Sequence, residues 1–325
     1  MTDVSTRSAP PYGTAVPDDE AGMRAALAWS AKGLGWTSPR PSVGCALVND
    51  GQLIGAGHTQ PGDGNPHAEI MALRMAQEND ASTHGATAYV TLEPCSHWGT
   101  TPPCTDALIQ ARIARVVCGV GDPNPCVNGQ GFELLRAAGV EVVENFMAAQ
   151  CARAQDAFLK YIVSGLPLVT LKCAVSLDGK IAAQNGHSQW ITGEASRRRA
   201  HELRHEHDAV LVGIGTVLAD DPQLSVRLDG NWKQPQKIVL DSQGRIPLDA
   251  KLLDASTQSG APRVHIVTIS MLDEKQRELE MRGVRVLRCE ANERGHVDLP
   301  ELWRVLGQEK ICSVLIEGGA GVATD

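Results

Sequence analysis

Apolar and polar positions alternate along this chain with two periods, one helical and one typical of strands. Residues 18–32 carry apolar side chains at helical spacing behind Asp18 and Asp19, either of which can cap a helix. Apolar runs at 43–49 and 53–57 flank Asp50-Gly51, a dipeptide typical of a two-residue hairpin turn. The pattern therefore predicts a helix followed by a β-hairpin.

The alternation of helices and strands continues along the rest of the chain. We predict a helix over 67–77, a strand over 86–92, a helix from Cys104, two strand–helix alternations up to 143 and a helix over 147–164. Gly165-Leu166-Pro167 marks a domain boundary. Strands are then predicted at 168–174, 209–213, 237–240, 263–268 and 312–316, with a helix at 195–206. This βαβ order predicts mixed or parallel sheets flanked by helices, with functional residues at strand ends.

Length and composition add limits on organisation and partners. A chain of 325 residues suits two domains, here 19–165 and 166–325, after a polar lead-in over 1–18 that we expect to be disordered. No apolar run reaches membrane-spanning length and no secretory signal is visible, so we expect a soluble cytoplasmic protein with no membrane partner. The net charge of −8 argues against a nucleic-acid partner. In a reducing compartment most of the nine cysteines are expected to be buried thiols or metal ligands, and Cys126, in a loop, is left undecided. The buried thiols are expected to be Cys45, Cys118, Cys151, Cys173, Cys289 and Cys312.

One group of residues indicates metal chemistry. His67, Cys95 and Cys104 can hold zinc at three corners of a tetrahedron and leave the fourth for water. Glu69 is not needed as a ligand and can carry a proton from that water to a departing amine, which is how zinc-dependent base deaminases work. The alternatives are a structural zinc, with His97 as the candidate fourth ligand, or a chance grouping.

The segments around these residues resemble a known enzyme family. The resemblance is carried by His67–Glu69, Thr91–His97, Thr101–Cys104, and also Val43–Cys45, Gly57–Thr59 and Asp122–Pro125. Together they are similar to the deaminase domain of the RibD family of bifunctional riboflavin-biosynthesis enzymes, including its long spacing between the two cysteines. The resemblance implies a cytidine-deaminase-like three-layer α/β/α domain, zinc ligands His67, Cys95 and Cys104, and Glu69 as the proton shuttle. The family usually has asparagine where this chain has Arg40, so the contacts to the pyrimidine are expected to differ.

The second half is less explicit by itself. Glycines follow predicted strands at Gly213–Gly215 and Gly318–Gly321, where backbone amides can approach a phosphate or simply form a tight turn. Leu171–Lys180, Gln189–Thr192, Asp208–Gly213 and Asp220–Pro222 are similar to the reductase domain of the same family, which has a dihydrofolate-reductase-like fold. That resemblance implies NADPH contacts from Ala174, Trp190, Thr216, Asp220, Ser242, Gly319, Ala320 and Gly321. It implies substrate contacts from Ser188, Arg204, Leu224, Arg227 and Glu317, of which the two arginines can grip a phosphate. Arg197–Arg199 is most simply a solvated helix face.

These features together predict a two-domain α/β enzyme of riboflavin biosynthesis. Its first domain would remove an amine from a diaminopyrimidinone that carries a ribosylamino phosphate, and its second would use NADPH to reduce the ribosyl chain to ribityl. Because family members continue for several tens of residues beyond the equivalent of Asp325, we expect the chain to be a fragment. The alternatives are a deaminase with a non-functional reductase remnant, a nucleoside or tRNA base deaminase, and a catalytically inactive zinc-binding protein. The resemblance implies a small-molecule substrate and a dimer or larger homo-oligomer.

Overall fold

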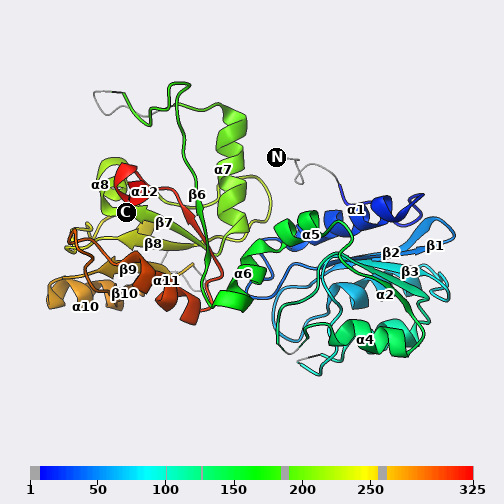
Figure 1. Ribbon diagram of the computed structural model, residues 1–325. Coiled ribbons are helices and arrows are strands. Elements are labelled where there is room, and N and C mark those ends of the chain that lie inside the picture. Colours follow the sequence, from blue (N-terminus) through cyan, green and yellow to red (C-terminus); the bar gives the residue numbers. More distant parts are fainter. Residues whose placement is uncertain (1–7, 100, 126, 184–189, 255–261, 325) are drawn as a thin grey trace. The chain divides into compact units, whose positions relative to one another are not determined.

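The chain folds into two compact units, Met1–Ser164 and Gly165–Asp325, each with one sheet and its own helices (Figure 1). The computed structural model describes residues 8–99, 101–125, 127–183, 190–254 and 262–324. Within that part of the chain, no helix combines the length and the apolar character needed to cross a membrane.

The first unit holds a five-stranded mixed sheet in the order β2-β1-β3-β4-β5. β1 pairs antiparallel with β2 and β3, whereas β3, β4 and β5 run parallel to one another. Its elements are α1 (Asp19–Ser30), η1 (Ala31–Gly33), β1 (Gly44–Asn49), β2 (Gln52–His58), α2 (Ala68–Glu78), β3 (Thr87–Val90), α3 (Cys104–Gln110), β4 (Arg115–Cys118), α4 (Gln130–Ala137), β5 (Glu141–Val143), α5 (Ala148–Ala154) and α6 (Asp156–Ser164).

Alternation along β1 gives this sheet two buried faces. Cys45 and Leu47 belong to the core that α2, α3 and α4 cover, whereas Ala46 and Val48 belong to the core under α1. Successive side chains of a strand point to opposite faces, so one strand contributes to both cores. The predicted three-layer arrangement is confirmed in this unit, as is the hairpin at Asp50-Gly51, where both residues have positive φ.

The second unit holds a six-stranded parallel sheet in the order β10-β9-β8-β7-β11-β6. Val210 and Val212 of β7 face one apolar core, and Ala209 and Leu211 face the other. Its elements are β6 (Leu168–Leu171), α7 (Glu194–Glu206), β7 (Ala209–Gly213), α8 (Ile214–Asp220), β8 (Gln236–Leu240), α9 (Lys251–Asp254), β9 (Val264–Thr268), α10 (Asp273–Met281), β10 (Arg285–Arg288), α11 (Leu299–Gln308), β11 (Ser313–Ile316) and α12 (Ala320–Thr324). Near-continuous apolar strands are typical of a parallel sheet that is buried on both sides.

The structure corrects the prediction of a disordered lead-in for the residues that it describes. Of residues 1–18, the first seven lie outside the described part, but the backbone N–H of Gly13 donates to Leu53 O at 2.8 Å and that of Val16 donates to Gly51 O at 2.8 Å. The Val16 side chain is buried in the core under α1. Residues 1–18 are rich in polar side chains and proline, so the prediction overlooked Val16, the apolar residue that packs this segment beside the hairpin.

The predicted helix over 147–164 is wrong in one respect, because it is two helices separated at Gln155. The buried Gln155 side chain donates to Thr91 O at 3.1 Å and lies 3.2 Å from Thr91 Oγ1. The backbone leaves helical geometry there to complete a tertiary contact. The predictions also omitted β10 and the five helices α8 to α12. Most of these segments are short or polar and carry little periodic signal. α11 is the exception, because Asp298 caps it and the buried Leu302 and Leu306 stand at helical spacing, so periodicity could have predicted it.

Candidate metal centre and strand-end cluster

The first turn of α2 places His67 and Glu69 on one side of the sheet. His67 is the N-cap residue, with extended backbone, and Glu69 lies in the first turn of α2. The helix can approach β2 closely because β2 carries glycine there: a Cβ on Gly57 would lie 2.4 Å from Met71 Cβ and 2.8 Å from Ala68 O. Close helix–strand packing therefore determines where these two side chains lie.

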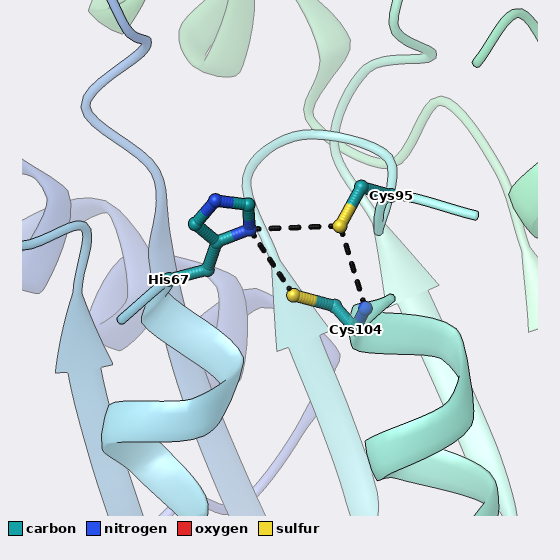
Figure 2. Close-up of side chains that lie close together, drawn as sticks. All are labelled: His67, Cys95 and Cys104. Carbon is teal, nitrogen blue, oxygen red and sulfur yellow. Dashed lines mark hydrogen bonds between the residues drawn. The ribbon is translucent and has the colours of Figure 1, made fainter. Parts of the chain in front are cut away.

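Cys95 and Cys104 come to the same place from the end of β3 and the start of α3 (Figure 2). Nδ1 of His67 lies 3.5 Å from Cys95 Sγ and 3.3 Å from Cys104 Sγ. The backbone N–H of Cys104 donates to Cys95 Sγ at 3.3 Å. In the described part of the chain, these three residues form the group of potential metal ligands whose donor atoms all lie within 4.8 Å of one another.

The donor set fits zinc. Zn–N and Zn–S bonds of about 2.0 to 2.3 Å in a tetrahedral site imply ligand-to-ligand separations of roughly 3.3 to 3.8 Å. The two nitrogen–sulfur distances of 3.5 and 3.3 Å lie in that range. His97, the predicted candidate for a fourth ligand, is exposed and outside the group. Three protein ligands and an open position are typical of a catalytic rather than a structural zinc site.

The two cysteines differ in their affinity for a proton. Hydrogen bonding with the Cys104 side chain, with further contributions from His67 and the Cys104 backbone, lowers the pKa of Cys95 to about 4. The pKa of Cys104 is raised, first by its hydrogen bond to Cys95 and then by burial. The pKa of His67 is raised, chiefly by its hydrogen bond with Cys95. One sulfur is thus prepared as a thiolate, the form that binds metals.

Glu69 is buried beside these ligands. Its side chain is 3% exposed, and burial is the main cause that raises the pKa of its carboxyl group. A raised pKa makes this carboxyl group a stronger proton acceptor than a free one, which suits a group that must accept and then return a proton.

Arg40 is directed to a loop rather than left free in solvent. Its Nη2 donates to Gln60 O, and its Nη1 donates to Asn65 O at 3.4 Å. Both nitrogens therefore hold the segment that leads to His67, and Nε is buried without a partner. Where the family usually has the short amide side chain of asparagine, this chain has an arginine that links its own loop to the loop of Gln60 and Asn65.

Glu93 lies within the motif Thr91–His97, but no function was predicted for it from the sequence. Its buried carboxylate accepts hydrogen bonds from three backbone N–H groups, those of Asp122, Gly129 and Gly131. An acidic residue between an apolar strand and a proline is unusual, because a buried carboxylate needs hydrogen-bond partners. This position in the sequence could therefore have indicated that Glu93 binds other parts of the chain.

A charged cluster lies at the carboxyl ends of the strands in the second unit. Arg204 Nε and Nη2 donate to the two oxygens of Glu317 at 2.6 and 3.0 Å, and Nη1 donates to Ser225 O at 2.9 Å. Lys172 Nζ lies 3.6 Å from Glu317 Oε2. The structure thus joins two residues that were predicted to contact substrate and adds Lys172, to which the sequence assigned no function. Three of the five N–H donors of Arg204 are therefore directed to Glu317 and Ser225 and not toward solvent, where a phosphate would enter.

Most residues predicted to contact the cofactor follow four neighbouring strands. The segments that contain Ala174, Thr216 with Asp220, Ser242, and Gly319–Gly321 follow β6, β7, β8 and β11 respectively. Because these strands are parallel, their carboxyl ends lie at one edge of the sheet. A Cβ on Gly319 would lie 3.9 Å from Thr216 Oγ1, so two of the segments are close neighbours.

The other predicted residues are placed differently. Trp190 is 74% exposed, and the Arg197 guanidinium lies 4.7 Å from its ring centroid. Leu224 is 3% exposed and packs in a core, so its side chain is not presented to a ligand, whereas Arg227 is exposed. Ser188 lies outside the described residues.

Two family models match the chain. Residues 16–120 match the cytidine and deoxycytidylate deaminase zinc-binding region, and residues 167–325 match the RibD C-terminal domain. The first match contains all three candidate ligands and Glu69, and the second contains the strand-end cluster.

Relatives match over most of the chain. It is 45% identical to riboflavin biosynthesis protein RibD of Actinobacillus pleuropneumoniae over 300 residues, covering 92% of this chain and 77% of that protein. It is 42% identical to Escherichia coli RibD over 317 residues, or 94% and 83% of the two chains. Among solved structures, the Thermotoga maritima diaminohydroxyphosphoribosylaminopyrimidine deaminase/5-amino-6-(5-phosphoribosylamino)uracil reductase aligns with a TM-score of 0.81 at 37% identity, covering 93% and 81%. Acinetobacter baumannii RibD aligns with a TM-score of 0.79 at 41% identity, covering 94% and 82%.

Proposed function

The chain belongs to the RibD family of riboflavin biosynthesis proteins, and from that premise we propose the residues and the substrates of its two reactions. It is a bifunctional enzyme with a zinc-dependent deaminase and a nicotinamide-dependent reductase. We assign the deaminase to residues 19–165 and the reductase to residues 166–325. The observation that carries the first assignment is the convergence of His67, Cys95 and Cys104 beside the buried Glu69.

In the first reaction the substrate is 2,5-diamino-6-ribosylamino-4(3H)-pyrimidinone 5′-phosphate, which loses its exocyclic amine as ammonia. His67, Cys95 and Cys104 hold zinc, which when bound lowers the pKa of a water molecule toward neutrality. A carboxylate oxygen of Glu69 takes a proton from the attacking water and delivers it to the nitrogen of the departing amine. The burial of Glu69 keeps that proton from exchanging with bulk water before it is delivered.

In the second reaction the product, 5-amino-6-ribosylaminouracil 5′-phosphate, is reduced to the ribityl compound with NADPH as the hydride donor. Lys172 and Arg204 surround Glu317 and orient its carboxylate at the strand ends, where it can contact the hydroxyl groups of the sugar. Arg227, exposed beside this cluster, is the cation that we assign to the substrate phosphate. The segments after β6, β7, β8 and β11 form the cofactor site.

Other features agree with an intracellular metabolic enzyme of this kind. None of the eight cysteines in the described part of the chain forms a disulfide, which agrees with a reducing compartment, although Cys173, expected to be buried, is exposed. We therefore infer that the enzyme acts in the cytoplasm on small molecules. We also infer a homo-oligomer, by analogy with the family.

Mass spectrometry of the products tests the proposal directly. Zinc-loaded protein is incubated with the diaminopyrimidinone phosphate, with and without NADPH. An exchange of the amine for oxygen is expected without NADPH, and a further gain of two hydrogens is expected with NADPH. Deamination without reduction would favour a non-functional reductase half. No mass change in protein that holds zinc would favour an inactive binding protein, and tRNA deamination would favour the nucleic-acid alternative.

A further inference from the structure

A buried carboxylate that takes no part in the proposed reaction lies two residues before a metal ligand. Glu93 is 5% exposed and precedes Pro94 and Cys95 in the segment that follows β3. Its Oε2 accepts from the backbone N–H groups of Asp122 and Gly129, both at 3.1 Å. Its Oε1 accepts from the backbone N–H of Gly131 at 3.0 Å. Asp122 and Gly129 precede α4, whereas Gly131 lies in its first turn. Residues 121–125 and 127–131, the loop after β4 together with the start of α4, are called here the wall loop.

We propose that Glu93 is a positioning residue of the deaminase site, whose carboxylate holds the wall loop against the turn that carries Cys95. The inference rests on the proposed deaminase function of the first unit. Glu93 itself does not touch the reacting atoms and acts through the loop that it holds.

A carboxylate satisfies all three of these donors. It accepts at both oxygens, whereas a glutamine side chain accepts at one atom and donates at the other. In either orientation, the NH₂ group of a glutamine would face at least one backbone N–H. These three hydrogen bonds are stronger than solvent-exposed ones, because their acceptor is a carboxylate and is buried.

The contact between the wall loop and the turn is also steric. A Cβ on Gly131 would lie 2.3 Å from Pro94 O and 3.0 Å from Glu93 Oε1. Glycine is therefore the residue that lets the loop lie directly on the turn. Nearby, Asn128 and Gly129 have φ of 35° and 88°, so the loop reaches Glu93 through left-handed backbone.

Topology places the wall loop beside the metal ligands. β3 and β4 are parallel neighbours with Val90 opposite Cys118, so the segments that follow them leave the same edge of the sheet. The backbone N–H of Glu93 donates to Val120 O at 2.8 Å, which joins the two segments at their start. The carboxyl group of Asp122 interacts electrostatically with Cys95 and His97. The wall loop thus borders the place where a substrate would meet the ligands, and Glu93 sets its distance from Cys95.

The test is Glu93→Gln in the full chain, compared with wild type after zinc loading. We expect KM for deamination to rise and kcat/KM to fall roughly 10- to 100-fold, because misplacing a binding wall by about 1 Å has effects of that size. Zinc content is expected to equal that of wild type. Reduction of separately supplied deaminated intermediate is expected to be unchanged, since the reductase residues lie in the other unit.

Hydrogen–deuterium exchange supplies a readout that does not depend on activity. The amides of Asp122, Gly129 and Gly131 are expected to exchange faster in Glu93→Gln. Gly131→Ala should act in the same direction, because its Cβ pushes the loop from Pro94 O, and it covers the case in which the first variant does not fold. Glu133→Gln, an exposed residue of α4, is the matched control and should resemble wild type.

Some outcomes would overturn the inference. An unchanged KM in folded, zinc-loaded Glu93→Gln would do so, as would unchanged protection of the wall-loop amides. Loss of zinc without faster exchange of the loop would show that Glu93 supports the metal ligands and not the wall. If wild type does not deaminate although the variant loosens the loop, the proposed function fails and the structural assignment of Glu93 stands.

Discussion

At the scale of single residues, the chemistry depends on groups whose proton affinity is changed by burial and by neighbours. Glu69, Cys95 and Cys104 lie within one small region and have pKa values shifted in different directions. Such divergence is expected where one group must carry a proton and another must stay ionised to bind a metal.

Glu69→Gln is expected to lower kcat for deamination by roughly 10²- to 10⁴-fold, because general acid–base catalysis contributes about that much. Zinc content and reductase activity should be unchanged, since Glu69 is not one of the ligands. Steady-state kinetics with metal analysis measures both. Glu78→Gln, at the exposed end of the same helix, is the control. Deamination at the wild-type rate in Glu69→Gln would contradict the assigned role.

His265 of β9 provides a prediction about pH. It is fully buried, its Nε2 lies 2.8 Å from Gln236 Oε1, and burial is the main cause that lowers its pKa from 6.5 to about 4. Between about pH 4 and pH 6.5, His265 therefore binds a proton in the unfolded chain but not in the folded chain. The free energy of unfolding should fall as pH decreases from about 6.5 to about 4, by about 2 kcal/mol between pH 7 and pH 5.

The measurement is urea unfolding of the full chain at pH 7 and pH 5, followed by hydrogen exchange of peptides from β9. His265→Gln removes the titrating group and should flatten this part of the pH dependence. His296→Gln, an exposed position in the same unit, should leave it as in wild type. An equal pH dependence in wild type and His265→Gln would show that other groups are responsible.

At the scale of elements, the metal centre depends on how closely α2 lies on β2. Gly55 and Gly57 face the helix, and a Cβ on Gly55 would lie 2.2 Å from Ala72 O. The two helices α2 and α3 each contribute a ligand at or near their first residue, so a shift of either would change the separations within the site.

Gly57→Ala is expected to reduce zinc affinity and deamination by displacing the first turn of α2, and to destabilise the first unit by about 1–3 kcal/mol through overpacking. Zinc competition with a chelator and thermal unfolding are the measurements. Gly215→Ala is the control, because no heavy atom lies within 4 Å of its Cβ position. Wild-type zinc affinity in Gly57→Ala would mean that the helix adapts without moving its ligand.

At the scale of the whole molecule, the two candidate sites belong to separate cores. The candidate metal ligands lie in Met1–Ser164, and the cluster of Lys172, Arg204 and Glu317 lies in Gly165–Asp325. Each unit has its own sheet with helices on both faces, so the folding of one site does not require the ligand of the other.

Removal of zinc is therefore expected to abolish deamination and leave reduction close to its original rate. Both reactions are measured on one chelated sample, each with its own substrate supplied, and zinc is then added back. Restored deamination after zinc addition is the control for irreversible damage. A parallel loss of both activities would show that the reductase depends on the metal centre.

Local pattern was enough to predict much of the fold and to single out three candidate metal ligands that the structure brings together. The helix behind Asp18, the hairpin at Asp50-Gly51 and the buried strands follow from periodicity and turn chemistry, which are properties of neighbouring residues. The residue types of His67, Cys95 and Cys104 likewise predicted a zinc site, because few other functions need that combination.

Tertiary structure decided what depends on residues distant in sequence. Gln155 interrupts a helix to reach Thr91, Glu93 binds amides that lie 29 to 38 residues away, and Arg204 pairs with Glu317 across 113 residues. Periodicity carries no record of such contacts, because each partner alone looks like an ordinary polar residue. The sequence by itself determined which groups could do chemistry, and packing determined which of them meet, since distance and burial exist only in the folded chain.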